Sequence, residues 1–185
     1  MKKNIFSKSL LMLKNPRSMI IAAMLAAIII VLDQPLLSIR IGAGLKINFI
    51  FIPVMICAIF YGPVVCAATC VIGDVLGVVL TGQAVIPQLL LVELVRGVMM
   101  GCIMFKKEPT LGRVVAAQST ANLFINMCLN TFMLMQVGYL SDQNIFLAIG
   151  SRVVKNIVFL PVEILILFFL LNSLIKAMKN NRLRP

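Results

Sequence analysis

The chain has 185 residues, of which 61% are hydrophobic and only 12% are charged, and its formal net charge is +11. This apolar content exceeds what a soluble domain of this size needs, so the composition excludes a soluble globular protein and indicates an integral helical membrane protein. The positive charge does not indicate nucleic-acid binding, because the lysines and arginines lie mainly at the ends of apolar runs, where membrane topology places them. A span takes about 20 residues, so six spans would use most of the chain and leave only short loops.

The chain begins with a basic tail, residues 1–17, in which Ile5–Leu13 is expected to form a short amphipathic helix on the membrane surface. A cleaved signal peptide is less favoured, because no A-x-A-type site leads into a soluble protein. The first span, about Ser18–Leu32, contains the sequence AAMLAA. Small residues four apart let another helix approach closely. The candidates for a partner-docking face, with internal packing as the alternative, are Ala22 and Ala26 on one face and Ala23 and Ala27 on another.

The later spans follow from the apolar runs between short polar or glycine-containing segments. The second span is predicted at about Ile47–Phe60 and the third from the turn Tyr61-Gly62-Pro63 to Leu80. After the turn Thr81-Gly82-Gln83, the remaining spans are expected at about Ala84–Phe105, Val114–Val137 and Ile145–Ile175. The last span is long enough to tilt or kink, and Pro161 would supply the kink.

The distribution of basic residues predicts the topology. The N-terminal tail, the loop Lys106–Arg113 and the tail 176–185 are basic, and six spans put all three on one side, which is then the cytoplasm. The segment Pro35–Asn48 falls outside, yet it carries Arg40 and Lys46 and no carboxylate. Two cations against the topological rule indicate capture of an anionic ligand from outside. A solvated loop with two stray charges is the alternative.

Polar residues within the spans are costly and usually face an interior or a cavity. Asp74 lies about two turns in from the outer end of the third span. Glu93 and Arg96 are spaced i, i+3 near the middle of the fourth span, where a self-neutralising pair is the simpler interpretation. In the fifth span an amide recurs every four residues, which fits either interhelical hydrogen bonding or the wall of a site. These amides are Asn122, Asn126 and Asn130.

In the last span, one helical stripe carries Arg152, Lys155, Asn156, Phe159 and Glu163. Arg152 and Lys155 lie about two to three turns in from the outer end of this span. Cations at this depth need partners, either the carboxylates of the spans or a bound anion. The outer halves of the third, fifth and sixth spans, capped by the Arg40/Lys46 loop, would form a pocket open to the outside. The candidate ligand-binding residues are Arg40, Lys46, Asn48, Phe49, Asp74, Asn126, Asn130, Arg152, Lys155 and Asn156.

Catalysis and metal binding find little support. There is no histidine, which removes the commonest general base and metal ligand, and Gly150-Ser151 therefore lacks a base to activate the serine. No GxxxxGK[ST] phosphate loop is present, and Asp74, Glu93 and Glu163 are too scattered for a metal cage. We expect no enzyme, no cofactor and no metal. The five cysteines fall within predicted spans without a CxxC pair and are interpreted as small apolar residues.

The order of three segments resembles that of a known family. Lys46–Pro53 reads K-I-N-F-I-F-I-P, Tyr61–Pro63 reads Y-G-P, and Asp74–Gly77 reads D-V-L-G. This arrangement, with the alanine-rich first span, resembles the substrate-binding S-component of an energy-coupling factor (ECF) vitamin transporter, folate-type. The specific motifs cover about Leu45–Gly82, and the layout covers nearly the whole chain. Glu93 and Arg96 are not part of the motif.

The resemblance implies an all-α integral membrane protein with six transmembrane helices in an S-component-like bundle, multi-pass in the cell membrane of a prokaryote, with both termini cytoplasmic. It implies high-affinity binding of a folate-class, anionic vitamin, and uptake driven by a transmembrane coupling subunit and two ATPase subunits. Folate has a glutamate tail that cations can pair with and a pterin edge whose N–H groups a carboxylate or amide can accept. The alternatives are an S-component for pantothenate or a queuosine precursor, a small helical channel, and an intramembrane enzyme.

Overall fold

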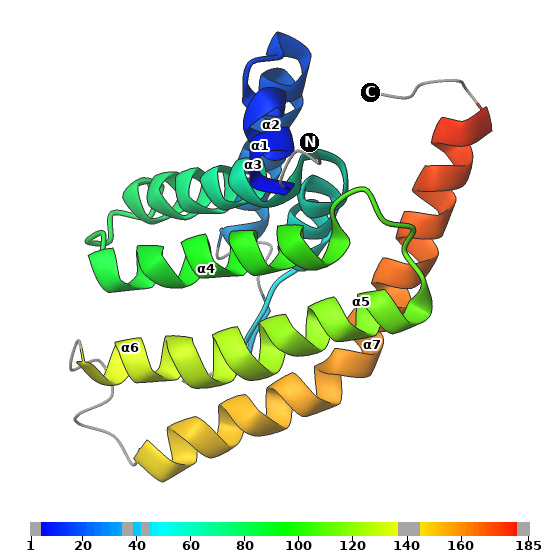
Figure 1. Cartoon of the computed structure of the whole chain (residues 1–185). Helices are drawn as coiled ribbons and strands as arrows, with labels where there is room; N and C mark the ends of the chain where they lie inside the picture. Colours follow the sequence, from blue (N-terminus) through cyan, green and yellow to red (C-terminus); the bar gives the residue numbers. More distant parts are fainter. Residues whose placement is uncertain (1–4, 35–38, 42–44, 137–144, 181–185) are drawn as a thin grey trace.

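The computed structural model describes residues 5–34, 39–41, 45–136 and 145–180. Within these ranges the chain is almost entirely helical, apart from one short antiparallel pair of strands (Figure 1). Four of the described helices contain stretches long and apolar enough to cross a membrane: α2 (Pro16–Asp33), α3 (Phe51–Leu80), α4 (Pro87–Met104) and, within the last helix, Asn156–Lys176. The fold is thus an all-helical membrane architecture, as the composition predicts.

The N-terminal helix α1 (Ile5–Leu13) has the predicted bounds. Helix α2 follows at once and starts with Pro16 in its first turn, where a missing N–H is harmless. The side chain of Asn15 caps it by accepting a hydrogen bond from the backbone N–H of Arg17 at 3.2 Å. The chain therefore turns sharply between a short helix and a long one.

Strands β1 (Ile39–Ile41) and β2 (Leu45–Ile47) pair antiparallel, with Arg40 directly opposite Lys46. The predicted start of the second span at Ile47 is wrong, because Ile47 belongs to β2 and helix α3 begins at Phe51. Pairing with β1 gives this apolar segment the backbone hydrogen bonds that a helix would otherwise supply. The two loop cations thus come from paired strands.

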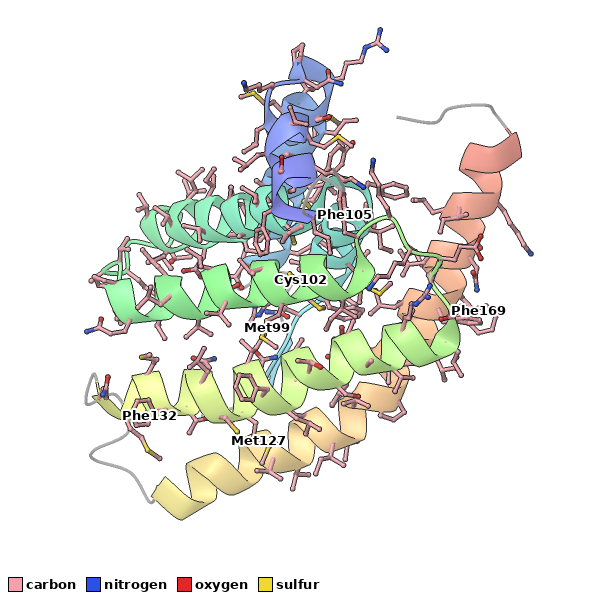
Figure 2. All side chains as sticks on the ribbon, in the orientation of Figure 1. Met99, Cys102, Phe105, Met127, Phe132 and Phe169 are labelled. Carbon is pink, nitrogen blue, oxygen red and sulfur yellow. The ribbon has the colours of Figure 1, made fainter. Side chains whose placement is uncertain are left out.

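Helix α3 is broken at Gly62, whose φ of 82° and ψ of −172° are far from helical values. Only glycine adopts this conformation readily, and the predicted turn at Tyr61-Gly62-Pro63 is confirmed as a break between two helical halves. The break is held from two sides. Ser9 Oγ of α1 donates to the carbonyl of Tyr61 at 2.8 Å, and the backbone N–H of Lys106 donates to the carbonyl of Ile59 at 3.0 Å. Phe105, which directly follows the C-terminal end of helix α4 (Pro87–Met104), lies against Gly62 (Figure 2).

Helix α4 starts at Pro87 rather than at the predicted Ala84 and packs along the second half of α3 (Figure 1). The two backbones touch. A Cβ added at Gly97 or Gly101 would lie closer than 3.0 Å to backbone atoms of Ala67 or Pro63. Gly73 makes a similar close approach from α3 to the side chain of Ile29 on α2. Small residues four apart in an apolar helix are the usual basis for such contacts.

The fifth helical segment contains three parts: α5 (Leu111–Ser119), the π-helix η1 (Thr120–Leu129) and α6 (Asn130–Gln136). It starts at Leu111 rather than at the predicted Val114. Helix α7 (Ile145–Asn180) contains Pro161 and bends about midway along its length (Figure 1). Its first half runs beside the α5–η1–α6 rod, which forms a second layer next to the α3–α4 layer.

The core is centred on α3, whose buried residues meet those of α2, α4, α5 and the second half of α7. The outer faces of α2 and α7 instead expose large apolar side chains, among them Ile20, Met24, Ile157 and Phe169. Apolar side chains with this exposure suit a lipid environment.

Candidate ligand-binding site

A chain of polar contacts links four helical segments. On α4, Arg96 forms an ion pair with Glu93, with 2.9 Å between Nη1 and Oε1. The same guanidinium donates from Nη2 to Oδ1 of Asn126 on η1 at 2.5 Å. Arg96 therefore joins the α4 layer to the α5–η1–α6 rod. Its role is not limited to neutralising Glu93 on the same helix.

The chain continues from η1 to α7. Asn126 donates to Asn122 Oδ1 at 3.1 Å, and Asn122 donates in turn to Oε2 of Glu163 on α7 at 2.5 Å. Gln118 of α5 donates from Nε2 to the same carboxylate oxygen at 2.8 Å. We call the six residues the polar network: Glu93, Arg96, Gln118, Asn122, Asn126 and Glu163.

The polar network borders a small, partly open cavity of about 50 Å³. The cavity lies where the hairpin leads into the start of α3. The Gly62 break is at the other end of the first half of α3, so the cavity and the break lie toward opposite ends of the bundle. This volume holds one or two water molecules. The lining residues combine amides and charges with apolar walls: Asn48, Ile50, Phe51, Val54, Arg96, Met100, Gln118, Ala121, Asn122, Asn126 and Glu163.

The π-helix η1 supplies both asparagines of the polar network. Asn122 is 4% exposed, so its amide has to be hydrogen-bonded, and it bonds to Asn126 and Glu163. π-helical turns are rare and often occur at functional sites, because the extra residue re-aims neighbouring side chains. Here η1 presents Asn122 to α7 and Asn126 to α4 at the same time.

The predicted ligand-binding residues are only partly brought together. Asn48 and Asn126 line the cavity. Phe49 is 38% exposed beside Phe51, with ring centroids 6.1 Å apart, and Phe51 is the aromatic residue that lines the cavity. Asp74 of α3 and Asn130 of α6 are half-buried and are not among the lining residues.

The remaining predicted residues lie on α7 and on the hairpin. Asn156 is buried in α7, at 7% exposure. The backbones of Arg152 and Lys155 are helical, and those of Arg40 and Lys46 are paired across the hairpin. The side chains of these four residues lie outside the described part of the structure. Their placement in the site stays a prediction.

Sequence reasoning did not assign Arg96, Gln118, Asn122 or Glu163 to the site. Glu163 stood on the predicted stripe of the last span, and Asn122 was part of the amide repeat, so their spacing carried a usable signal. Gln118 gave none, because a single glutamine near a span end is unremarkable. Within the described residues, no group of three or more histidine, cysteine, aspartate or glutamate side chains could hold a metal ion.

The alanines of α2 separate into two faces. Ala26 is buried, with its carbonyl near Gly73 of α3, and Ala22 is half-buried against the core. Ala23 and Ala27 are exposed. Of the two predicted docking faces, the one with Ala22 and Ala26 is used inside the chain, and the one with Ala23 and Ala27 is open.

A shallow surface depression of about 360 Å³ lies between α4 and η1. Met99 extends from α4 toward η1 there (Figure 2). The other lining residues are mostly apolar: Ser119, Thr120, Leu123 and Phe124. It is separate from the polar network, since none of its lining residues belongs to that network.

Known proteins resemble this chain in fold and in sequence. The folate transporter FolT of Leuconostoc mesenteroides is 28% identical over 164 residues, which cover 86% of either chain. FolT of Clostridium novyi is 26% identical over 125 residues, covering 67% of this chain and 71% of that protein. A crystal structure of FolT bound with folic acid superposes with a TM-score of 0.76 at 25% identity, covering 86% of this chain and 95% of that one. The sequence model of the family described as the substrate-specific component of ECF transporters matches residues 17–178. The chain therefore belongs to the family of substrate-specific components of ECF transporters, which are multi-pass membrane proteins.

Proposed function

We propose that this chain captures folate at the outer face of the membrane for import by an ECF transporter. The observation that carries the proposal is the similarity to folic acid-bound FolT over 95% of that chain. The polar network is consistent with it, since amides, a guanidinium and a carboxylate converge on one cavity with apolar walls. Pockets of this composition are typical of small-molecule sites.

The anionic glutamate tail of folate would pair with the hairpin cations Arg40 and Lys46, which the backbone register puts opposite each other. Asn48, between the hairpin and α3, would contact the middle of the ligand from the cavity wall. Five further residues are candidates for contacts with the ligand in a pocket enlarged by its binding: Asp74, Asn130, Arg152, Lys155 and Asn156.

Binding of folic acid to the purified wild-type protein, measured by isothermal titration calorimetry in detergent, tests the proposal. Pantothenate serves as the competing vitamin. We expect tight binding of folic acid and none of pantothenate, and the reverse would assign the chain to another vitamin. Arg40→Ala and Lys46→Ala should each weaken folic acid binding by about 1–3 kcal/mol, the usual loss for a charge-assisted hydrogen bond. Lys107→Ala, exposed in the α4–α5 loop, is the control and should bind as the wild type does.

The membrane arrangement is part of the proposal. We propose six spans, with the two halves of α3 on either side of Gly62 counted separately, a basic tail at 1–17 and another at 176–185, all within a single membrane domain. Helix α1, the Gly62 break and the α4–α5 loop meet at one end through the Ser9–Tyr61 and Lys106–Ile59 hydrogen bonds. The N-terminal tail that carries α1 and the α4–α5 loop are both basic, which supports a cytoplasmic location for this end and for both termini.

Transport requires partners in this proposal: a transmembrane coupling subunit and two ATPase subunits. The sequence contains no GxxxxGK[ST] phosphate loop, which supports ATP hydrolysis by the partner subunits. Ala23 and Ala27 on the open face of α2 would let a helix of the coupling subunit approach closely.

A further inference from the structure

Gln118 has an unused acceptor. Its side chain is 2% exposed, and its Oε1 is the buried side-chain atom that lacks a hydrogen-bond partner among the described residues. Its Nε2 is engaged with Glu163, and turning the amide over would set an oxygen against the carboxylate. The orientation is therefore fixed, and a buried carbonyl of this kind is stabilised only when a donor reaches it. Gln118 lines the cavity, so the donor can come from a ligand.

Glu163 also has spare acceptor capacity. Both of its described hydrogen bonds, from Gln118 and Asn122, end on Oε2. A carboxylate accepts about four hydrogen bonds through its two oxygens. Within the described residues Glu163 has no ion-pair partner, since the guanidinium of Arg96 is engaged with Glu93 and Asn126. The cavity thus has an acceptor-rich end between α5 and α7 and a donor, Arg96, on the α4 side.

We propose that Gln118 and Glu163 recognise the N–H edge of a flat heteroaromatic ring, and so determine specificity for the 2-amino-4-oxopyrimidine part of the vitamin. This inference rests on the proposed function and deepens it. Such a ring presents two neighbouring donors, the exocyclic amino group and the ring N–H, to a carboxylate and the adjacent amide oxygen. Phe51, Val54 and Met100 provide apolar walls for the ring faces.

The size of the cavity sets a condition on binding. At about 50 Å³ it is too small for a fused ring, so the α5–α7 side has to move away from α3 and α4 when the ligand enters. Because Gln118 and Glu163 are bonded to each other, they move together and keep their acceptors side by side.

The experiment compares two ligands in calorimetry: folic acid and the analogue in which a methyl group replaces the 2-amino group. The wild-type protein should prefer folic acid by about 10–100-fold, because the analogue leaves a buried acceptor unpaired. In Gln118→Met and Glu163→Gln this preference should fall to less than about threefold, mainly through weaker binding of folic acid. The controls are the same substitutions at exposed positions, Gln136→Met and Glu108→Gln, which should keep the wild-type preference.

The outcomes separate the two proposals. No binding of folic acid by the wild-type protein would overturn the proposed function. Equal wild-type affinity for the two ligands, or a preference that survives in both variants, would overturn the inference and leave the proposed function standing. Glu163 and Gln118 also tie helices together, so retained binding of the analogue is the criterion for a folded variant. Loss of both ligands in both variants would assign the pair a structural role and overturn the inference.

Discussion

The backbone contact between α3 and α4 predicts that Gly101→Ala destabilises the protein although alanine favours helices. Ala is more favourable than Gly in a helix interior by about 1 kcal/mol. At Gly101, however, the added Cβ would lie closer than 3.0 Å to backbone atoms of Pro63 and Gly62, which cannot rotate away as a side chain would. The helices must separate instead, and overpacking of this kind costs about 3 kcal/mol at the upper end of its usual range. The net loss is about 2 kcal/mol, and Gly97→Ala should behave alike at Ala67.

The matched control is Gly150→Ala, since Gly150 is helical and a Cβ there would meet nothing within 4 Å. This variant should be more stable than the wild type by up to about 1 kcal/mol. The chain has no tryptophan, so thermal unfolding is best followed with a thiol-reactive dye that reports exposure of the buried Cys57, Cys66 and Cys70. Gly101→Ala should lower the midpoint by about 4–8 °C. Equal shifts of the same sign in Gly101→Ala and Gly150→Ala would refute the close approach of the backbones.

Four further outcomes are expected. Ser9→Ala should lower the unfolding free energy by about 1–3 kcal/mol, because the Tyr61 carbonyl loses its buried donor, while Ser7→Ala should change it little. Arg96→Met should lower stability by about 2 kcal/mol, since Glu93 loses its ion-pair partner, and should also weaken folic acid binding; a stable variant with wild-type affinity would remove Arg96 from the site. Replacing Ala23 and Ala27 with leucine should abolish folate uptake in cells and leave folic acid affinity unchanged, with Ala116→Leu as the exposed control on α5. Cysteines at positions 38 and 141 should both react with an impermeant maleimide added outside intact cells, and labelling of only one would contradict the six-span arrangement.

The parts of the fold that depend on local composition were predictable. The bounds of α1, the break at Gly62 and the turn at Gly82 follow from amphipathic spacing, from glycine and proline, and from short polar segments, and all are present. The hairpin was missed because Ile47 opens the apolar run that continues into α3, and only the pairing of β2 with β1 separates it from the helix. Hydropathy alone does not distinguish them.

The candidate site was harder to predict because its residues come from distant segments. Asn48 and Asn126 were identified from their place in a loop and in a repeat. Gln118 became a candidate only when the fold put it against Glu163, across 45 positions of sequence. A four-residue spacing of asparagines fits an ordinary α-helix, so it gave no sign that η1 is a π-helix. It also gave no sign that Asn122 and Asn126 bond to different helices.

The hydrogen bonds of Ser9 also bear on how the protein is made and handled. Ser9 is synthesised early, but its partners, the Tyr61 carbonyl and the N–H groups of Val64 and Val65, emerge from the ribosome much later. The N-terminal helix can therefore form these bonds only after the Gly62 break and the first turn of the second half of α3 have been synthesised. An affinity tag that draws α1 away from the bundle would leave the Gly62 break uncapped. Purification and labelling are thus better served by a tag at the C-terminal end of the chain.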